Sequence, residues 1–262
     1  MANKVLEKTL NNVDKEDLQT GWAAPAGLDA QQLNYSGPIS GTSQVMTAGG
    51  SARAALVLFA LIVASGTWAW TSIDNDKAGI ALFGGIIVAL VFGLITTFKP
   101  KVARVTAPLY ALAEGVALGT LSRLFEDQYN GIVIQAVLAT AAIVFVMYSL
   151  YSFGFIKVTD KFRKIVIGAT LGIMAFYFLS FILGMFTDSI PLINDSGPAG
   201  IIFSAVVIVI AAMNLALDFD FIERGSKAGL PKYMNWAAAY GLAVTVVWIY
   251  LEVLRLLAKT RD

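Results

Sequence analysis

The chain has 262 residues, of which 57% are hydrophobic and 14% are charged, and its mean hydropathy is +0.71. A soluble domain carries about 25% charged residues, so this composition predicts a polytopic membrane protein whose first partner is the lipid bilayer. The net charge of +1 argues against a nucleic-acid partner. The chain has no Cys for thiol chemistry and no His, so any pH sensing falls to carboxylates, whose charged form is disfavoured by burial.

Residues 1–50 are predicted to form a soluble, largely flexible N-terminal arm, and residues 51–262 the membrane domain. The second half of the arm is rich in Gly, Pro, Ser, Thr and Gln and lacks a core-forming pattern, as in a linker. The arm does not begin with the apolar run of a signal peptide, because the first apolar run follows Arg53.

Seven apolar segments follow the arm, each of about 20 residues or more, the length that a helix needs to cross a bilayer. They lie near residues 54–73, 78–98, 105–125, 131–153, 165–186, 199–221 and 235–258. Their short connections favour antiparallel neighbours in a compact bundle. The sequence therefore predicts an all-α membrane protein with seven transmembrane helices.

The distribution of Lys and Arg between the connections predicts the orientation. The second, fourth and sixth connections are rich in basic residues, whereas the first, third and fifth carry Lys77, Arg123 and several acidic residues. Because basic connections stay on the cytoplasmic side, the N-terminus is expected inside and, after seven spans, the C-terminus outside. Lys259 and Arg261 are basic residues at an end that is expected outside, which conflicts with this rule. The alternative is a re-entrant last segment with both ends inside.

Two pairs of glycines mark close contacts between helices. Gly115 and Gly119 form a GxxxG pattern in the third segment, and Gly168 and Gly172 form one in the fifth. Small residues at this spacing let the backbones of membrane helices approach closely. Both pairs are therefore predicted to be packing sites.

Two carboxylates, Asp218 and Asp220, close the sixth apolar segment. An ionisable residue inside a membrane segment is costly and usually functional. Asn214 and Asp218 are four residues apart and share a helical face, whereas Asp220 points away from Asp218. Asp218 is therefore the better candidate to face a cavity. The alternative is that both acids lie at the headgroups and only end the helix in water.

Two glutamates lie within other segments. Glu114 is at least two turns from either end of the third segment, so it must be protonated, paired or beside a cavity, either as a functional group or as a hydrogen bond between helices. Glu252 lies in the seventh segment and has Arg255 three residues further on, a local pair that would neutralise it. Thr245, Trp248 and Glu252 form a partly polar stripe on a helix that is otherwise apolar all round, as expected at the centre of a bundle.

The sequence carries no enzyme signature. It lacks a Walker loop, an HExxH motif and any His for a nucleophile relay. An intramembrane aspartyl protease needs two acids that meet at one bond, and Asp218 and Asp220 point apart. The chain is therefore predicted not to be an enzyme and to need no cofactor.

Three motifs occur in order after the arm, among the seven spans. They are the run Ala107-Pro-Leu-Tyr-Ala-Leu-Ala-Glu-Gly115, Asp218 followed by Ile222, and the closing Tyr250-Leu-Glu-Val-Leu-Arg-Leu-Leu257. Together they make residues 50–262 resemble the Bax inhibitor family, in a bacterial branch. The resemblance implies six helices packed around a central seventh. It also implies a pH-sensitive calcium leak, in which two aspartates, one each on the sixth and seventh helices, share protons and close the pore.

By this resemblance, Asp218 is the sixth-helix acid of the gate. An ungapped alignment of the closing motif places Thr245 at the seventh-helix position, with Glu252 two turns, about 10 Å, further along the helix. Either Glu252 replaces the missing acid from a different depth, or the two-carboxylate latch is absent; Glu114 or Asp220 are the other acids that could partner Asp218. Asp218 and Glu252 are the candidate calcium ligands, because calcium takes oxygen ligands.

The predicted function is a proton-gated cation (calcium) leak channel or ion transporter in the bacterial inner membrane. The alternative is a non-conducting membrane scaffold, or a regulator of membrane proteases or other membrane proteins, in which the acids only lock helices together. A proton-coupled transporter of small solutes is the third interpretation. An internal repeat would favour that interpretation, and none is convincing.

Overall fold

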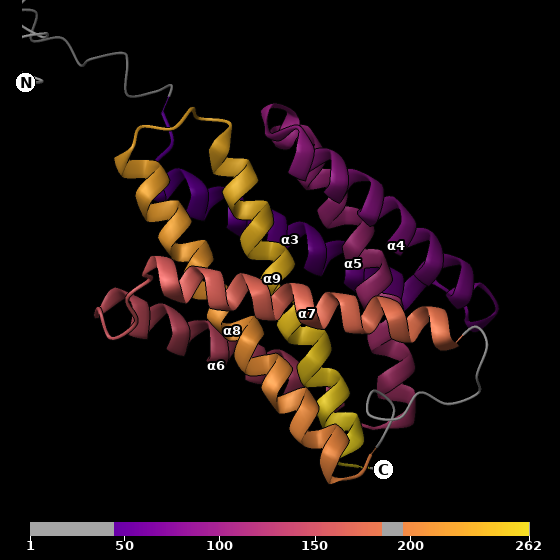
Figure 1. Ribbon diagram of the computed structural model, residues 1–262. Helices are drawn as coiled ribbons and strands as arrows, with labels where there is room; N and C mark the ends of the chain where they lie inside the picture. The colour runs from indigo at the N-terminus through magenta and orange to yellow at the C-terminus, as the bar shows by residue number, and fades with distance from the viewer. Residues whose placement is uncertain (1–44, 185–195, 262) are drawn as a thin grey trace, which may run out of the picture. The chain divides into compact units, whose positions relative to one another are not determined.

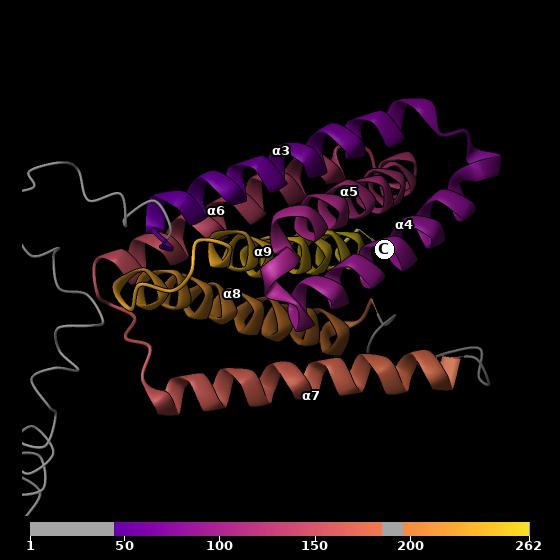
Figure 2. The ribbon, with the colours of Figure 1, turned by 90° about the horizontal axis from the view of Figure 1, so that it is seen from above.

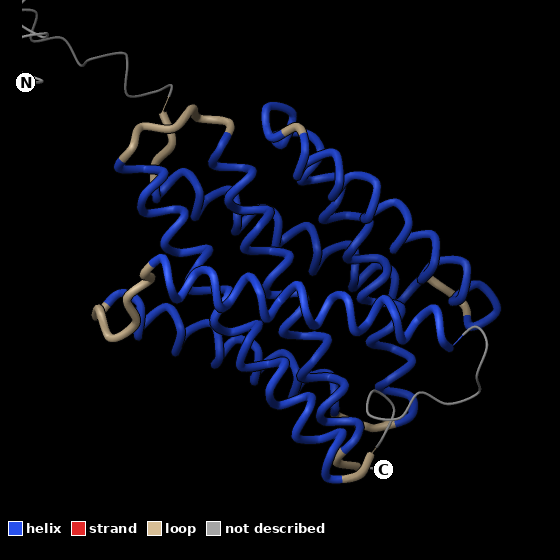
Figure 3. Tube along the Cα trace, viewed as in Figure 1, coloured by secondary structure: helices blue, strands red, loops and turns tan. Residues whose placement is uncertain are grey.

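The computed structural model describes residues 45–184 and 196–261, and over these residues the secondary structure is helical (Figure 1, Figure 3). The long helices are α3 (Ala48–Ser72), α4 (Asn75–Phe98), α5 (Ala103–Gln128), α6 (Ile132–Ser152), α7 (Asp160–Gly184), α8 (Pro198–Lys227) and α9 (Met234–Lys259). A 3₁₀ turn, η3 (Pro100–Val102), joins α4 to α5. Each long helix falls on one of the apolar segments, which confirms the prediction of an all-α fold.

Six of these helices are long and apolar enough to cross a membrane, namely α3, α4, α6, α7, α8 and α9. The helix that does not meet this description is α5, which packs against α3, α4 and α9. Its buried positions are mostly Ala, Gly, Ser and Thr. A helix that other helices cover does not need an apolar surface all round, and α5 as a seventh span stays a prediction.

The most enclosed of the six membrane-length helices is α9. It packs against α3, α4, α5, α6 and α8, and Figure 2 shows it in the middle of these helices. In contrast, α7 packs along α8 at the edge of the group and reaches α9 through the side chain of Tyr177. Large apolar side chains such as Phe178 and Phe181 cover the outer face of α7. Five helices therefore pack against α9, the sixth reaches it through one side chain, and a complete ring of six packed helices stays a prediction.

The folded part of the chain begins earlier than predicted. Met46 is 1% exposed, and its N–H donates to the carbonyl oxygen of Leu230 over 2.6 Å. The Thr47 side chain caps the start of α3 by accepting a hydrogen bond from a first-turn N–H. Residues 45–50 therefore belong to the membrane domain, and the rest of the predicted arm, residues 1–44, lies outside the described residues.

The helix α8 extends beyond the apolar segment from which it was predicted, and pairs of charged side chains stabilise the extension. The helix continues past residue 221 to Lys227. Arg224 pairs with Asp220, and Lys227 pairs with Glu223, each across four residues. Pairs at this spacing stabilise a helix. The end of the apolar run therefore does not mark the end of the helix.

Only one of the two predicted glycine contacts forms within the described residues. A Cβ on Gly119 would collide with the backbone of Gly66 in α3, and a Cβ on Gly115 would collide with α3 as well. The two backbones therefore approach as the GxxxG pattern predicts. A Cβ on Gly168 or Gly172 of α7 would meet no heavy atom of the described chain within 4 Å. The prediction for α7 is thus wrong for contacts within this part of the chain.

Contacts at the helix ends show which ends lie together. At one end, the start of α3 is bonded to the α8–α9 connection. At the other end, Arg123 of α5 donates to the carbonyl oxygens of Trp70 and Ile73, and Arg261 donates to that of Asn130. The end of α9 therefore lies with the end of α3 and the α5–α6 connection. α9 is one continuous helix, about 39 Å long at 1.5 Å per residue, which is long enough to cross a membrane, and a full span in place of the re-entrant alternative stays a prediction.

The two basic residues at the C-terminal end are used in contacts. Lys259 is 6% exposed, and its Nζ donates to the carbonyl oxygen of Gly200 and to Oγ of Ser204, each over 3.1 Å. Arg261 donates to Oε1 of Gln135 over 2.9 Å. These cations bind the end of α9 to α8 and α6. If this end lies outside, as predicted, their structural use accounts for two basic residues there.

Candidate functional site

Asp218 lies in α8 and faces α9. Its Oδ2 is buried and has no hydrogen-bond partner among the described residues. The side chain of Thr245 on α9 interacts with the carboxylate, and a Cβ on Gly241 would lie 3.6 Å from Oδ1. Buried polar atoms in proteins almost always have a hydrogen-bond partner, so an atom without one has a specific physical cause. For an ionisable side chain within a membrane helix, the default hypothesis is a functional role.

The α9 residue beside Asp218 is a threonine. Thr245 is 8% exposed, and its hydroxyl donates to the carbonyl oxygen of Gly241 over 3.2 Å. The family resemblance implies that a second acid stands at this position. A hydroxyl can donate a hydrogen bond to a carboxylate, but it does not ionise and cannot share a proton as a second carboxylate does. The structure therefore provides a one-carboxylate contact between α8 and α9 at Asp218.

Glu252 belongs to a second site on the same helix. It is 1% exposed, and its Oε1 accepts from the Tyr177 hydroxyl over 2.8 Å and from Nη1 of Arg255 over 2.7 Å. Nη1 of Arg255 also donates to the Tyr177 hydroxyl over 3.0 Å. Oε2 of Glu252 is buried without a partner in the described part of the chain. The local pair with Arg255 is confirmed, and the contact with α7 is new.

The two predicted calcium ligands therefore have different neighbours. Asp218 faces Thr245, and Glu252, seven residues beyond Thr245, lies about 10 Å further along α9 and faces α7. In residues 45–184 and 196–261 no three His, Cys, Asp or Glu side chains come together as a metal cluster. The two carboxylates therefore do not share one site.

Glu114 lies against a different face of α9. It is close enough to Tyr110 of α5 and Tyr240 of α9 to act on both electrostatically. The two tyrosine rings meet edge to face with their centroids 4.9 Å apart. A Cβ on Gly93 of α4 would lie 2.8 Å from the Tyr240 hydroxyl, so this glycine makes room for the tyrosine. Glu114 therefore belongs to a third polar site, between α4, α5 and α9.

Asp220 is held by two cations. It is 8% exposed, its Oδ2 accepts from Nη2 of Arg163 in α7 over 3.1 Å, and Arg224 pairs with the same oxygen. It points away from Asp218, as their spacing predicts, and it is buried rather than free at the headgroups. This geometry makes Asp220 an ion pair that ties α7 to α8.

Sequence reasoning missed the role of α7. Arg163, Thr170 and Tyr177 are seven residues apart, so they share one face of the helix. Thr170 accepts a hydrogen bond from Nδ2 of Asn214 over 2.8 Å, and the other two bond to Asp220 and Glu252. The signal was present as three polar residues at heptad spacing on an apolar helix. Their partners, however, depend on which helices lie beside α7.

Six membrane-length helices, with the buried acids Asp220 and Glu252 bonded between helices, define an integral, multi-pass membrane protein. A family model described as Bax inhibitor 1 like matches residues 3–262, nearly the whole chain. The chain belongs to this family, which confirms the resemblance seen in its motifs. No curated protein and no solved structure matches the chain.

Proposed function

We propose that the protein is a proton-gated cation leak channel, with calcium as the candidate ion and Asp218 as the gate. The observation that carries this proposal is Oδ2 of Asp218, a carboxylate oxygen buried in a membrane helix without a hydrogen-bond partner among the described residues. A carboxylate that only fastened α8 to α9 would be expected to have both oxygens satisfied. An unsatisfied oxygen is available to a proton or to a cation.

The proton decides the state of the gate in this proposal. A protonated, neutral Asp218 rests between α8 and α9 and bonds to Thr245. Loss of the proton leaves a charge that is costly to bury without a partner, so water or a cation must enter between the two helices. Calcium suits such a site because it takes carboxylate, carbonyl and water oxygens as ligands. The gate therefore opens when Asp218 is ionised.

Glu252 is the second acid on the proposed path. It lies about 10 Å beyond Thr245 on α9, and its Oε2 is buried and unpartnered among the described residues. An ion would pass from one carboxylate to the next, which favours weak, successive binding over a tight site. Glu114 faces another side of α9, so it stands as the less favoured partner. The α7 helix would complete a ring of six around α9 through its contact at Tyr177.

We also propose a bacterial inner membrane as the location, with the N-terminus in the cytoplasm. The support is the charge around two connections. Lys157 lies in the α6–α7 connection, with Lys161, Arg163 and Lys164 in the first turns of α7, and Lys232 lies in the α8–α9 connection, with Arg224 and Lys227 at the end of α8. The ends of α3 and α9 and the α5–α6 connection would then lie on the opposite side.

The alternative is a non-conducting scaffold or regulator of membrane proteases. One observation favours it: three polar side chains of α7, namely Arg163, Thr170 and Tyr177, hold it against α8 and α9. The outer face of α7 carries apolar side chains that no described helix covers. A second membrane protein could pack there.

Calcium flux into liposomes that contain the purified protein tests the proposal across a range of pH. Wild type should leak more as the pH rises, and Asp218→Asn should remove this dependence while the protein still folds. Asp76→Asn is the matched control, because Asp76 is an exposed acid at the start of α4. A wild-type protein that passes no ion at any pH, or an Asp218→Asn variant with the wild-type response, would leave the scaffold as the better account.

A further inference from the structure

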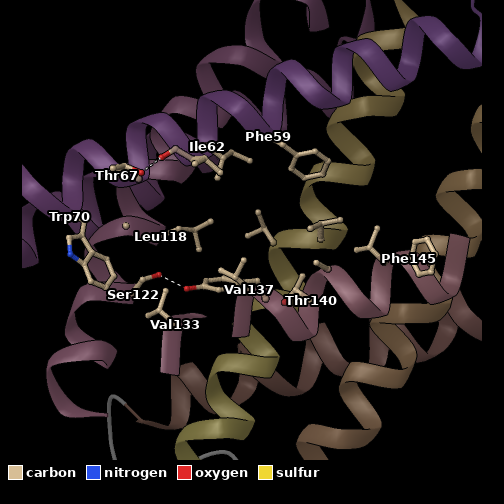
Figure 4. Close-up of a pocket in the computed structure, with 18 of the residues that line it drawn as sticks. Phe59, Ile62, Thr67, Trp70, Leu118, Ser122, Val133, Val137, Thr140 and Phe145 are labelled. Atoms are coloured by element: carbon tan, nitrogen blue, oxygen red, sulfur yellow. Dashed lines mark hydrogen bonds between the residues drawn. The ribbon is translucent and has the colours of Figure 1, made fainter. Parts of the chain in front are cut away.

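A large apolar cavity lies between α3, α5, α6 and α9 (Figure 4). Its volume is about 1010 Å³. Ile62 of α3, Leu118 of α5 and Val247 of α9 form buried parts of its wall. Ligand pockets have volumes of about 300–1,000 Å³ and walls that are mostly apolar with a few polar groups. This cavity is at the upper end of that range.

The cavity opens sideways between α3 and α6. Within the described residues these two helices do not approach one another, and each packs on other helices of the bundle. The residues at the opening are apolar and exposed, at 66% for Val63, 46% for Val137 and 71% for Phe145. Because α3 and α6 are both membrane-length helices of an integral membrane protein, this opening faces lipid hydrocarbon.

The cavity is at least as long as one leaflet of a bilayer. Its lining on α3 runs from Phe59 to Trp70, about 16 Å of helix, and on α6 from Val133 to Tyr148, about 22 Å. Half of a hydrocarbon core is about 15 Å thick. Trp70 lies at one end of the cavity and Phe145 at the other (Figure 4). A tryptophan near a helix end is typical of the headgroup level.

Few polar atoms reach the cavity. The hydroxyls of Ser122 and Tyr250 lie 2.6 Å apart and bond to each other near the Trp70 end. Thr140 of α6 is 6% exposed, and its Oγ1 has no partner among the described residues. A cavity of this kind does not hold a cluster of water, since each water needs two to four polar partners, and an apolar guest suits it better.

We propose that this cavity binds one acyl chain of a membrane phospholipid. The chain enters from the bilayer between α3 and α6, its ester end lies near Trp70, and its methyl end lies near Phe59. The lining of the cavity is continuous with the lipid-facing surface, which is why a bilayer lipid is the expected occupant. None of the four candidate acids lines the cavity, so the lipid site stands whether or not the protein conducts ions.

Native mass spectrometry of the detergent-solubilised protein, titrated with a phospholipid, tests for binding. Wild type should retain one phospholipid at equimolar lipid. Ala141→Phe should lose it, because Ala141 lines the cavity. Ala142→Phe is the matched control, since Ala142 is exposed on the neighbouring face of α6 and does not line the cavity. If Ala141→Phe does not fold, Val137→Phe replaces it.

Fluorescence quenching locates the bound chain. A variant that keeps only Trp70 should be quenched saturably by a phospholipid with brominated acyl chains, and a variant that keeps only Trp68 should not. Trp68 is 58% exposed, two residues away at a similar depth, and does not line the cavity. Equal, non-saturating quenching of both tryptophans overturns the proposal, because the cavity then holds only bulk lipid. Quenching by a brominated free fatty acid but not by the phospholipid also overturns it, as does binding that Ala141→Phe and Val137→Phe both leave intact.

Discussion

The contact between Tyr177 of α7 and Glu252 of α9 provides a direct test of how the outer helix is held. The Tyr177 hydroxyl donates to Oε1 of Glu252 over 2.8 Å, and Arg255 donates to both of these oxygens. Glu252 is 1% exposed, so water cannot take the place of a lost partner. Tyr177→Phe removes only the hydroxyl and keeps the ring, whose centroid lies 5.2 Å from the Arg255 guanidinium carbon. Glu252→Gln removes the charge from the other side of the contact.

The expected cost follows from these partners. Hydrogen bonds between side chains in membrane proteins average about 0.6 kcal/mol and reach about 1.7 kcal/mol, because the unfolded chain in the membrane also finds partners. Arg255 keeps Oε1 of Glu252 bonded after the hydroxyl is lost, so Tyr177→Phe should cost about 1 kcal/mol. Glu252→Gln should cost more, about 2 kcal/mol, because it leaves a half-buried guanidinium without its acid. The coupling energy between the two substitutions should be about 1 kcal/mol.

Reversible unfolding of the purified protein in mixed micelles of a mild detergent and dodecyl sulfate measures these free energies. The two single variants and the double variant form a thermodynamic cycle. Tyr148→Phe is the control, because Tyr148 is 55% exposed. A coupling energy of zero, together with a Tyr177→Phe variant as stable as the control, would refute the reasoning that this contact holds α7.

Three further predictions concern packing, topology and the arm. Gly119→Val should destabilise the protein by about 3 kcal/mol, because its side chain would collide with the α3 backbone; unfolding in mixed micelles measures this. Gln128→Cys should react with an impermeant thiol reagent in intact cells and Thr159→Cys should not, since the chain has no native Cys and we propose that the basic side is cytoplasmic. Deletion of residues 1–42 should leave membrane insertion and folding intact in a fractionation assay, whereas deletion through Met46 should reduce stability because Met46 is buried.

Each of these predictions has an outcome that contradicts it. Gly172→Val is the control for packing, because a Cβ at Gly172 meets no heavy atom of the described residues within 4 Å. Equal stability of the two valine variants would mean that α3 and α5 do not touch as described. Labelling of Thr159→Cys but not of Gln128→Cys would show that the orientation is the reverse of the one predicted. Failure of the shorter deletion to insert would show that the arm is a structural part of the membrane domain.

The sequence was sufficient to place the helices because an apolar run of membrane length has few other uses. It was less informative about helix ends, where polar contacts act. The Thr47 cap starts α3 inside the predicted arm, and the pair of Glu223 with Lys227 carries α8 past its apolar run. Neither effect is visible in hydropathy. The helix that is least apolar, α5, is also the one that neighbouring helices cover on three sides.

The candidate site was predictable in part. The family alignment placed Thr245 opposite Asp218, and the two side chains interact. The local pair of Glu252 with Arg255 was predictable because it depends only on helix geometry. The bond from Tyr177 to Glu252 was not, because it depends on which face of α7 meets α9. Contacts between distant helices need the packing of the whole bundle, and a single sequence does not contain that information in readable form.

The polar and apolar features of α9 lie on opposite faces of the helix. At about 100° per residue, Gly241, Thr245 and Glu252 fall together on one side, and the cavity-lining Val247 and Tyr250 fall on the other. The first side meets α8 and α7, and the second meets the cavity between α3 and α6. The proposed ion path past Asp218 and Glu252 would therefore lie on the α7–α8 side of α9. A lipid in the cavity would contact the face of α9 that lies opposite Thr245 and Glu252, so the proposed lipid site and the proposed gate use different faces of one helix.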